Sequence, residues 1–259
     1  MSVSSVPRSV FVERANEWLQ PSRFKDYCPN GLQVEGRAEI STLVSGVTAS
    51  LALIEAAIAR GADTVLVHHG LFWRGQDGTL TGWMRERVAK LIQNNINLLA
   101  YHLPLDAHAQ YGNNAQLALQ LGLQTTATFG EQNLGHMGVN LDPQTQDSFK
   151  ASDLALRVFK ALGKEPLVVD PDPKRIIRRI AWCTGGAQSW FEDAIKSGAD
   201  VFITGEISEP QAHLARESGV AFLACGHHAT ERYGALALGG ALAKEFGIDH
   251  QFIDIDNPA

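Results

Sequence analysis

The sequence has few cysteines and no long apolar run, and each absence excludes classes of protein. Three of the 259 residues are cysteine; Cys28, Cys183 and Cys225 lie far apart, and none forms a C-x-x-C pair. Neither a disulfide framework nor a thiolate zinc site is therefore indicated. No stretch approaches the ~18 apolar residues that a membrane span requires, and residues 1–18 lack the apolar core of a signal peptide. We therefore expect a cytoplasmic protein with no membrane partner.

An excess of basic residues is also missing. Lys and Arg number 22 against 28 Asp and Glu, which gives a formal net charge of −6. The basic residues are scattered, apart from a group at 174–179 that we interpret as a solvated edge. A surface for duplex nucleic acid is therefore not favoured. A hydrophobic content of 45% with 19% charged residues is typical of a globular protein.

The standard catalytic motifs are absent as well. The chain contains no GxxxxGK[ST] phosphate loop, no GxGxxG after a strand, no GxSxG elbow and no HExxH helix. The Pro-Cys-x-x-Cys part of a zinc deaminase signature is also missing. Any chemistry must therefore be carried by other residues.

What the chain does contain is an internal repeat. Glu55–Asp63 and Glu192–Asp200 agree at six of nine positions, at an offset of 137. Each lies between apolar runs that read as parallel strands, the first pair being 42–47 and 64–67 around a helix at 50–60. Further on, 98–106 pairs with 223–231 at an offset of 125, which implies an extra loop within 71–84 of the first copy.

The repeat predicts an α/β protein of two related halves packed around a shared metal cleft. We expect a first half at 1–125 that opens with an amphipathic helix at 8–20, and a second half at 176–259. Between them, 126–175 reads as a small α+β insertion, with a strand at 135–141, a helix capped by Ser152 that ends at Gly163, and a strand at 167–169.

Polar side chains gather in three windows directly after predicted strands. The windows are His68-His69, His102-x-x-x-Asp106-x-His108, and His227-His228-x-x-Glu231. Ligands bind at the carboxyl edge of such sheets. Imidazole with carboxylate suits Zn, Fe, Mn or Co, and the groups suffice for two ions sharing a carboxylate.

Each feature also has a plainer interpretation. A lone His-His pair is more often a hydrogen-bonded surface pair, but the repeat independently relates the second and third windows, which favours metal binding. We expect His136 and His250 to be structural or solvent-facing, and His213 to lie on a surface helix. Glu206 and Glu209 fit either a supporting role beside the site or helix capping.

The motifs VTAS (47–50), VHHGLFW (67–73), HLPLDAH (102–108), AWCTGGAQS (181–189), DVFITGE (200–206) and GHHATE (226–231) resemble the YbgI family. PNGLQVEG (29–36) and FIDIDNPA (252–259) match as well, so the resemblance covers nearly the whole chain. That family is described as dinuclear metal centre hexameric proteins, or GTP cyclohydrolase 1 type 2. The resemblance implies a toroidal homo-hexamer with two divalent metal ions per subunit in an interdomain cleft.

The resemblance also implies roles for individual residues. Carried over by motif, the metal ligands are His68, His69, Asp106, His227 and Glu231, with Glu231 bridging. The implied activity opens the imidazole ring of GTP, or of a related small-molecule cyclic amide, by attack of a metal-bound hydroxide at C8. His102 or His228 would then carry protons.

Two other functions are compatible with the same residues. A non-catalytic metal-binding or metal-delivery protein would use the same ligands, but it would leave no coordination position open. A ring-shaped protein associated with nucleic acid would need basic residues around its central hole, which the overall acidity argues against.

Overall fold

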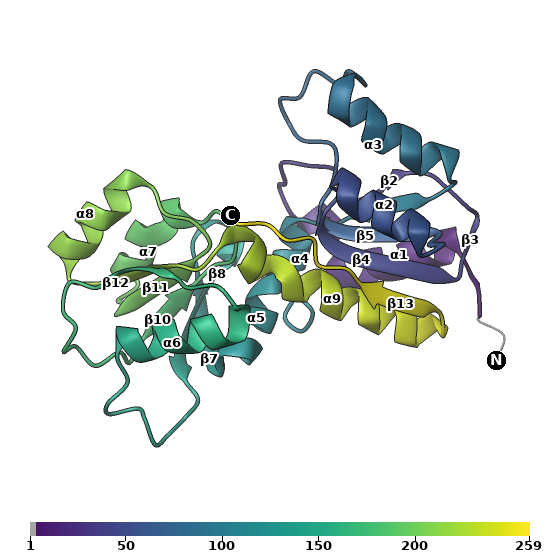
Figure 1. Cartoon of the computed structure of the whole chain (residues 1–259). Helices are drawn as coiled ribbons and strands as arrows, with labels where there is room; N and C mark the ends of the chain where they lie inside the picture. Colours follow the sequence, from purple (N-terminus) through teal and green to yellow (C-terminus); the bar gives the residue numbers. More distant parts are fainter. Residues whose placement is uncertain (1–3) are drawn as a thin grey trace. The chain divides into compact units, whose positions relative to one another are not determined.

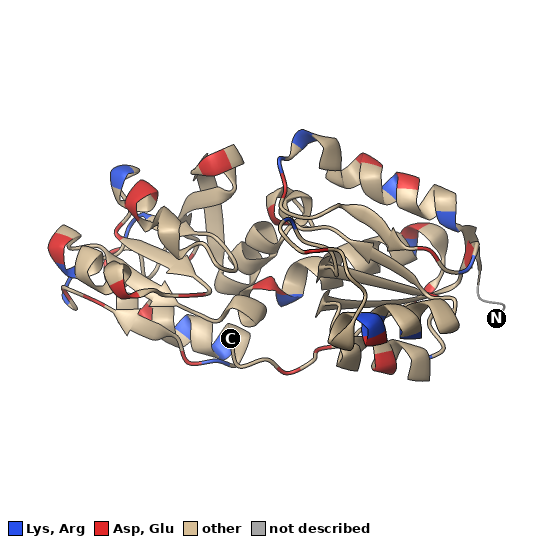
Figure 2. Cartoon of the chain, turned by 90° about the horizontal axis from the view of Figure 1, so that it is seen from above, with Lys and Arg blue, Asp and Glu red and all other residues tan. Residues whose placement is uncertain are grey.

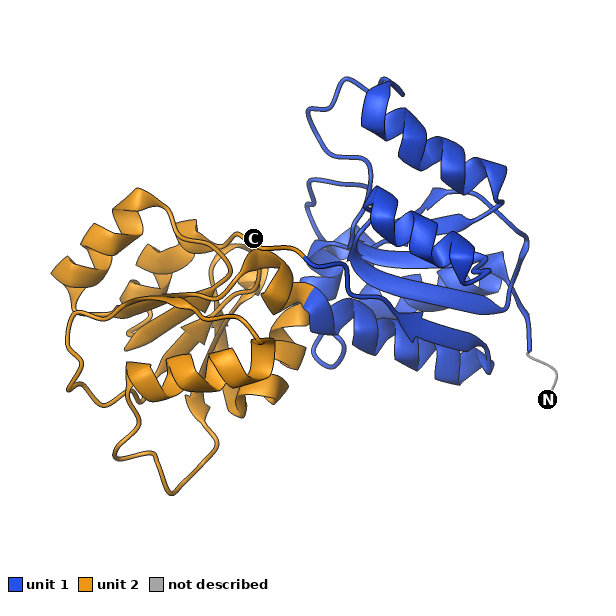
Figure 3. Cartoon of the chain, in the orientation of Figure 1, with its two compact units in different colours: residues 1–112, 232–256 blue, residues 113–231, 257–259 orange. Residues whose placement is uncertain are grey.

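The computed structural model describes residues 4–259, so residues 1–3 of the expected first segment lie outside the described part of the chain. The chain divides into two compact units (Figure 3). Unit 1 runs to residue 112 and includes 232–256, whereas unit 2 comprises 113–231 and 257–259. The three expected segments differ from these units, because 126–175 is part of unit 2 and 232–256 of the expected second half is part of unit 1.

Unit 1 is built on a five-stranded sheet. In spatial order its strands are β13 (Asp249–Phe252), β4 (Thr42–Thr48), β5 (Thr64–His69), β6 (Asn97–Ala100) and β2 (Gly31–Val34). The first four are parallel, and β2 is antiparallel to β6. Because β13 pairs with β4, the C-terminal segment completes this sheet, which explains why it belongs to unit 1. A short antiparallel pair joins β1 (Val6–Pro7) to β3 (Glu39–Ile40).

Helices cover both faces of this sheet (Figure 1). One face packs against α2 (Leu51–Ala59) and α3 (Gly82–Gln93). The other packs against α1 (Arg8–Leu19), α4 (Leu103–Ala107) and the part of α9 (His227–Phe246) that belongs to unit 1. Adjacent strand residues alternate between the two cores: Val44 lies in the first and Leu43 in the second. The expected opening helix is confirmed, with Phe11, Ala15 and Leu19 buried.

Unit 2 is built on a six-stranded sheet. In spatial order its strands are β7 (Leu123–Phe129), β8 (Gly135–Asn140), β10 (Ile180–Trp182), β11 (Val201–Thr204), β12 (Ala221–Ala224) and β9 (Leu167–Val169). The central three are parallel, and β7, β8 and β9 extend the sheet in antiparallel pairs. The segment expected as an insertion therefore supplies outer strands to the second sheet, because their backbone hydrogen bonds need a partner.

The helices of unit 2 also lie on both faces of its sheet (Figure 1). They are α5 (Asn113–Leu121), α6 (Ala151–Leu162), α7 (Phe191–Lys196), α8 (Glu209–Ser218) and the first turn of α9, with 3₁₀ turns η2 (Glu131–Asn133) and η3 (Gln188–Trp190); η1 (Pro21–Arg23) is in unit 1. The cap expected at Ser152 is wrong. Lys150 is the N-cap of α6, and the Asp153 carboxylate accepts its backbone N–H at 2.9 Å. Gly163 does end the helix, at φ 71°.

The strand register shows how the repeat is built. Val65 of β5 pairs with Leu98, and Phe202 of β11 pairs with Phe222. The offset between β5 and β11 is therefore 137 residues (202 − 65). The offset between the next strands of the two copies, β6 and β12, is 124 residues (222 − 98) rather than the expected 125. The expected offset holds only after Gly226, an added residue with φ +96° that precedes α9. The extra loop of the first copy is confirmed: 70–81 separates β5 from α3, against 205–208 between β11 and α8.

Basic and acidic residues are interspersed along the elements of each unit (Figure 2). Three members of the basic group at 174–179 have side-chain partners: Arg175 lies 2.5 Å from the Asp200 carboxylate, Arg178 lies 3.5 Å from Asp147, and Arg179 donates to the Ser197 carbonyl. Within the part of the chain that the structure describes, no helix has the length and apolar character needed to cross a membrane.

Candidate metal centre

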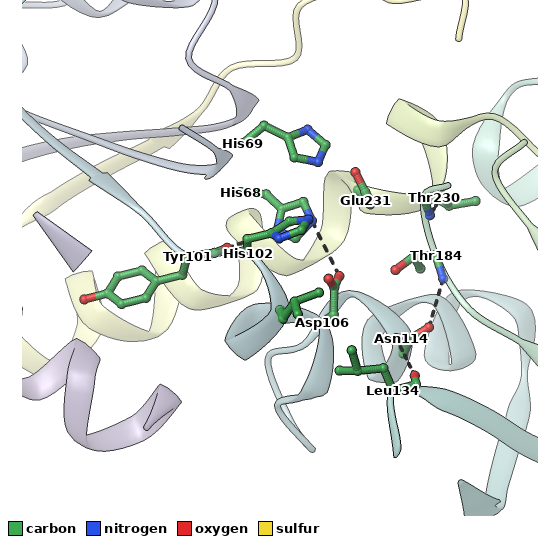
Figure 4. A network of polar contacts seen from close by, with 12 residues as sticks. His68, His69, Tyr101, His102, Asp106, Asn114, Leu134, Thr184, Thr230 and Glu231 are labelled. Atoms are coloured by element: carbon green, nitrogen blue, oxygen red, sulfur yellow. Dashed lines mark hydrogen bonds and ion pairs between the residues drawn. The ribbon is translucent and has the colours of Figure 1, made fainter. Parts of the chain in front are cut away.

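In unit 1, the last two residues of β5 are histidines at the carboxyl edge of the sheet. His68 is fully buried, and its Nδ1 donates to the backbone carbonyl of Tyr101, just beyond the neighbouring strand, at 3.0 Å. Its Nε2 lies 3.5 Å from Oδ1 of Asp106, which α4 presents (Figure 4). Parallel pairing of β5 with β6 brings these groups to one edge, as expected from the sequence.

His69 and His102 lie beside His68. Each of the three histidines offers one ring nitrogen, and these atoms lie within 4.8 Å of one another, close enough to hold a metal ion. Nδ1 of His69 lies 3.2 Å from Oγ1 of Thr48, on the paired strand β4. The ring centroids of His68 and His102 are 5.0 Å apart.

A carboxylate that sequence reasoning missed holds His102. Oδ1 of Asp26 lies 2.7 Å from Nδ1 of His102, and the Asp26 side chain is almost fully buried. Burial by itself raises the pKa of Asp26, but hydrogen bonds from His102 and Asn30 outweigh it and lower the pKa to about 2. The sequence signal was weak, since Asp26 lies in an irregular segment just before the PNGLQVEG motif.

In unit 2, a second histidine lies between two carboxylates. His227 and Glu231 occupy the first turn of α9 at i and i+4, with Nε2 of His227 3.2 Å from Oε2 of Glu231. Nδ1 of His227 lies 2.6 Å from Oε1 of Glu206, so Glu206 has the supporting role rather than capping a helix. Burial would lower the pKa of His227, but the hydrogen bonds and charges of Glu231 and Glu206 raise it to about 9.

A glycine turn places Glu231 in unit 2. The backbone N–H of Gly185 donates to Oγ1 of Thr230 at 3.0 Å, and that of Thr184 donates to Oδ1 of Asn114 at 3.0 Å (Figure 4). Gly185 has φ +70°, and a Cβ there would overlap Oε1 of Glu231. The AWCTGGAQS motif therefore contributes backbone that passes directly beside the carboxylate, which only glycine permits.

The hydrogen-bonding pattern of the two histidine–carboxylate pairs fits a bound cation. The Tyr101 carbonyl can only accept, so Nδ1 of His68 carries a hydrogen, and Nε2 of the same ring is turned toward Asp106. Nδ1 of His227 likewise faces Glu206, which leaves Nε2 toward Glu231. A lone pair opposite a carboxylate requires a proton or a metal ion. Imidazole whose second nitrogen is held by an acceptor is the usual arrangement of metal-binding histidine.

The structure gives His108, His136 and His213 structural roles or surface positions. His108 accepts the backbone N–H of Tyr111 at 2.9 Å and stacks on its ring, so it shapes the turn after α4. His136 is buried beside Trp182, and His213 lies exposed on α8, as expected. His228 lies next to His227 at the start of α9, where its backbone N–H donates to the Ala259 carbonyl at 3.3 Å.

Two buried free thiols hold their protons more tightly than an exposed cysteine does. Burial, with the nearby charges of Asp26 and Asp106, raises the pKa of Cys28 to about 12, and burial also raises the pKa of Cys225.

The whole chain is similar to known proteins. The family model described as Duf34/NIF3 (NGG1p interacting factor 3) matches residues 7–258. A Pseudomonas aeruginosa protein named GTP cyclohydrolase 1 type 2 homolog is 50% identical over 255 residues, which cover 98% of this chain and 100% of that protein. The solved structure of protein ybgI is 44% identical with a TM-score of 0.92, over 98% of this chain and 100% of that one. TTHA1606 from Thermus thermophilus is 30% identical with a TM-score of 0.83, at the same coverage.

Proposed function

Because the chain belongs to the Duf34/NIF3 family, as its resemblance to YbgI-type proteins predicted, we propose that it is a hydrolase dependent on two divalent metal ions. The proposed ligands are His68, His69 and Asp106 from unit 1, and His227 and Glu231 from unit 2. The observation that carries the proposal is that each unit contains a histidine held at Nδ1 by an acceptor, with Nε2 facing a carboxylate. When bound, divalent ions in such sites lower the pKa of water and polarise the bond to be cleaved.

The proposed substrate is a purine nucleotide such as GTP, which the name shared by the relatives supports. Water adds to C8 of the imidazole ring, and a C8–N bond breaks to leave a formamide. Hydrolysis of that formamide by a second water releases formate and frees the amine. In this reaction we assign to Nε2 of His102 the removal of a proton from water and its return to the departing ring nitrogen.

Formate release from GTP tests this function directly. Metal-replete protein should release formate, and His68→Ala should abolish the release because it removes a ligand. His213→Ala is the matched control, since His213 is an exposed histidine that contacts only Glu209 among the interactions described. If wild-type protein retains its metal and releases no more formate than His68→Ala, catalysis on GTP is wrong. A metal-binding or metal-delivery role would then be favoured.

We also propose that the chain forms the homo-hexamer typical of YbgI-type proteins. Support comes from four large apolar side chains that are 40–53% exposed on α6 and β9 of unit 2: Leu156, Phe159, Leu167 and Val168. Exposed apolar groups of this kind mark association surfaces. Light scattering should give six times the 28.1 kDa chain mass, and Leu156→Glu with Phe159→Glu should lower it. An unchanged mass for the double variant would exclude this face from the assembly.

A further inference from the structure

Asp26 is surrounded by donors on both carboxylate oxygens. Oδ1 lies 2.7 Å from Nδ1 of His102 and accepts the backbone N–H of Tyr27 at 2.6 Å. Oδ2 accepts the amide of Asn30 at 2.8 Å and the backbone N–H of Leu103 at 2.9 Å. Only 4% of the Asp26 side chain is exposed, so these protein groups, rather than water, determine what the carboxylate does.

This arrangement determines which nitrogen of His102 carries hydrogen. Backbone N–H groups can only donate, so both carboxylate oxygens of Asp26 act as acceptors. Nδ1 of His102 must therefore be the donor, and in the neutral ring Nε2 then holds the lone pair. Oδ1 of Asn30 accepts the backbone N–H of His102 at 2.7 Å, which holds the main chain as well as the ring.

A metal-binding role for Asp26 is the main alternative. Asp26, Cys28 and His102 each offer a ligand atom within 4.8 Å of the others. However, both oxygens of Asp26 already accept two hydrogen bonds each, and a metal ion would have to displace them. Cys28 is a buried thiol whose pKa is raised by burial and by the nearby charges of Asp26 and Asp106. The contacts therefore favour an orienting role.

Aromatic rings further restrict His102. The edge of Trp73 meets its ring at 83°, with centroids 5.1 Å apart, and the ring of His68 lies 5.0 Å away. Only 16% of the His102 side chain is exposed. With Nδ1 taken by Asp26, Nε2 is the nitrogen available beside His68 and His69.

We propose that Asp26 is a positioning residue that holds His102 as the Nδ1–H tautomer, so that Nε2 is the atom that moves the proton during hydrolysis. This inference rests on the proposed function for the identity of the reaction. The placement of the hydrogen on His102 can be tested without that reaction.

The tautomer is measured by ¹⁵N–¹H correlation spectra of histidine-labelled, zinc-loaded protein. His102, identified from the spectrum of His102→Gln, should show hydrogen on Nδ1. Asp26→Asn should shift part of the population to the Nε2–H form and retain the zinc of the wild type. Asp77→Asn is the control, because Asp77 is an exposed carboxylate that accepts backbone N–H at Thr79 and is remote from any histidine contact described.

Kinetics test whether Asp26 acts through His102. Asp26→Asn should lower kcat for formate release by about 10²–10³-fold with little change in KM, which is the usual contribution of a general base. In the His102→Gln background the same change should alter kcat by less than about threefold, because the residue it orients is gone.

Three results would overturn the proposal: a wild-type Nε2–H tautomer, loss of zinc from folded Asp26→Asn or His102→Gln, or equal kinetic losses in both backgrounds. The wild-type spectrum decides the tautomer even if Asp26→Asn does not fold. If wild-type protein releases no formate, the proposed function fails and with it the proton-transfer step, whereas the tautomer result still decides whether Asp26 orients His102.

Discussion

The two copies of the repeat share a backbone frame and differ in the side chains at its edge. Asp63 and Asp200 are equivalent, since 200 − 63 is 137, and Oδ2 of each accepts two backbone N–H groups where the first strand of its copy begins. In unit 1 these belong to residues 41 and 42, and in unit 2 to 178 and 179. The aspartate of the repeated Gly-Ala-Asp motif therefore holds the backbone at the start of each sheet and is not part of the candidate metal centre.

The site differs because equivalent positions carry different groups. His68 corresponds to Gly205, by the same offset of 137. A Cβ at Gly205 would lie 2.6 Å from Cα of His227, so no histidine fits there. In unit 1, Asp106, which lies four residues after His102, therefore faces His68. In unit 2, Glu231, which lies four residues after His227, faces His227 itself.

The related histidines His102 and His227 are both held at Nδ1 by a carboxylate, but the carboxylates come from different parts of the chain. Glu206 occupies the position that corresponds to His69, since 206 − 69 is 137, whereas Asp26 comes from the N-terminal segment. The repeat therefore preserves the way a histidine is held without preserving the residue that holds it.

The largest expected effect comes from removing the acid that lies four residues after the histidine in either copy, which is Asp106 in unit 1 or Glu231 in unit 2. Asp106→Ala and Glu231→Ala should each lower metal affinity by more than about 100-fold, beyond the 10–100-fold of groups that only support a ligand. The core should stay folded, because both residues lie at the edge of their sheets. Metal analysis of the purified variants measures this effect, with Glu209→Ala, an exposed acid on α8, as control. Full occupancy in both variants would contradict the assignment.

Gly185→Ala tests the glycine turn that is particular to unit 2. The added Cβ would overlap Glu231, so metal affinity should fall about 10–100-fold. Gly163→Ala is a matched control: its φ of +71° imposes the same backbone strain, about 1 kcal/mol, but no atom lies within 4 Å of the new Cβ. Calorimetric titration with zinc compares the two. Equal affinities would show that the turn can move away from Glu231.

Substituting Asp63 or Asp200 compares how much this shared backbone arrangement contributes to the free energy of unfolding in each unit. Asp63→Ala should lower the free energy of unfolding by about 3 kcal/mol, because it leaves partly buried donors of Ser41 and Thr42 without their acceptor. Asp200→Ala should cost about 2 kcal/mol, since Asp200 is more exposed and water can replace it. Urea unfolding measures both. A larger loss at Asp200 would mean that its ion pair with Arg175 outweighs burial.

The smallest expected effect is the pH dependence contributed by a buried histidine of unit 2. Burial beside Trp182 lowers the pKa of His136 to about 4. The unfolded chain binds the proton more readily, so this contribution to stability is complete above pH 6.5 and is lost as the pH falls toward 4, the loss being about 2 kcal/mol at pH 5. His136→Gln should remove that part of the acid loss in urea unfolding curves recorded across this range, whereas exposed His213→Gln should not. An unchanged acid slope in His136→Gln would show that His136 titrates normally.

Local patterns predicted most elements but not the strand register or the second sheet's full width. Short apolar runs located β4 and β5 on either side of a helix, because parallel strands buried on both faces consist of nearly continuous apolar residues. The offset error came from Gly226, an added residue that a one-dimensional alignment cannot separate from the strand before it. The outer strands β8 and β9 were predicted as strands and β7 was not, and the pairing of β8 and β9 with the second sheet depends on hydrogen bonds between distant segments.

The sequence by itself determined the α/β class, the internal repeat and the histidine and acid windows, because strand period and the polarity of strand ends are local properties. It also placed the chain in its family through motifs that span almost all of it. Only the tertiary structure decided which acceptor holds each histidine. Asp26 reaches His102 across 76 residues, and Gly185 passes beside Glu231 across 46. Contacts between such distant positions leave no period or spacing in the chain, because they arise only when sheets bring separate loops to one edge.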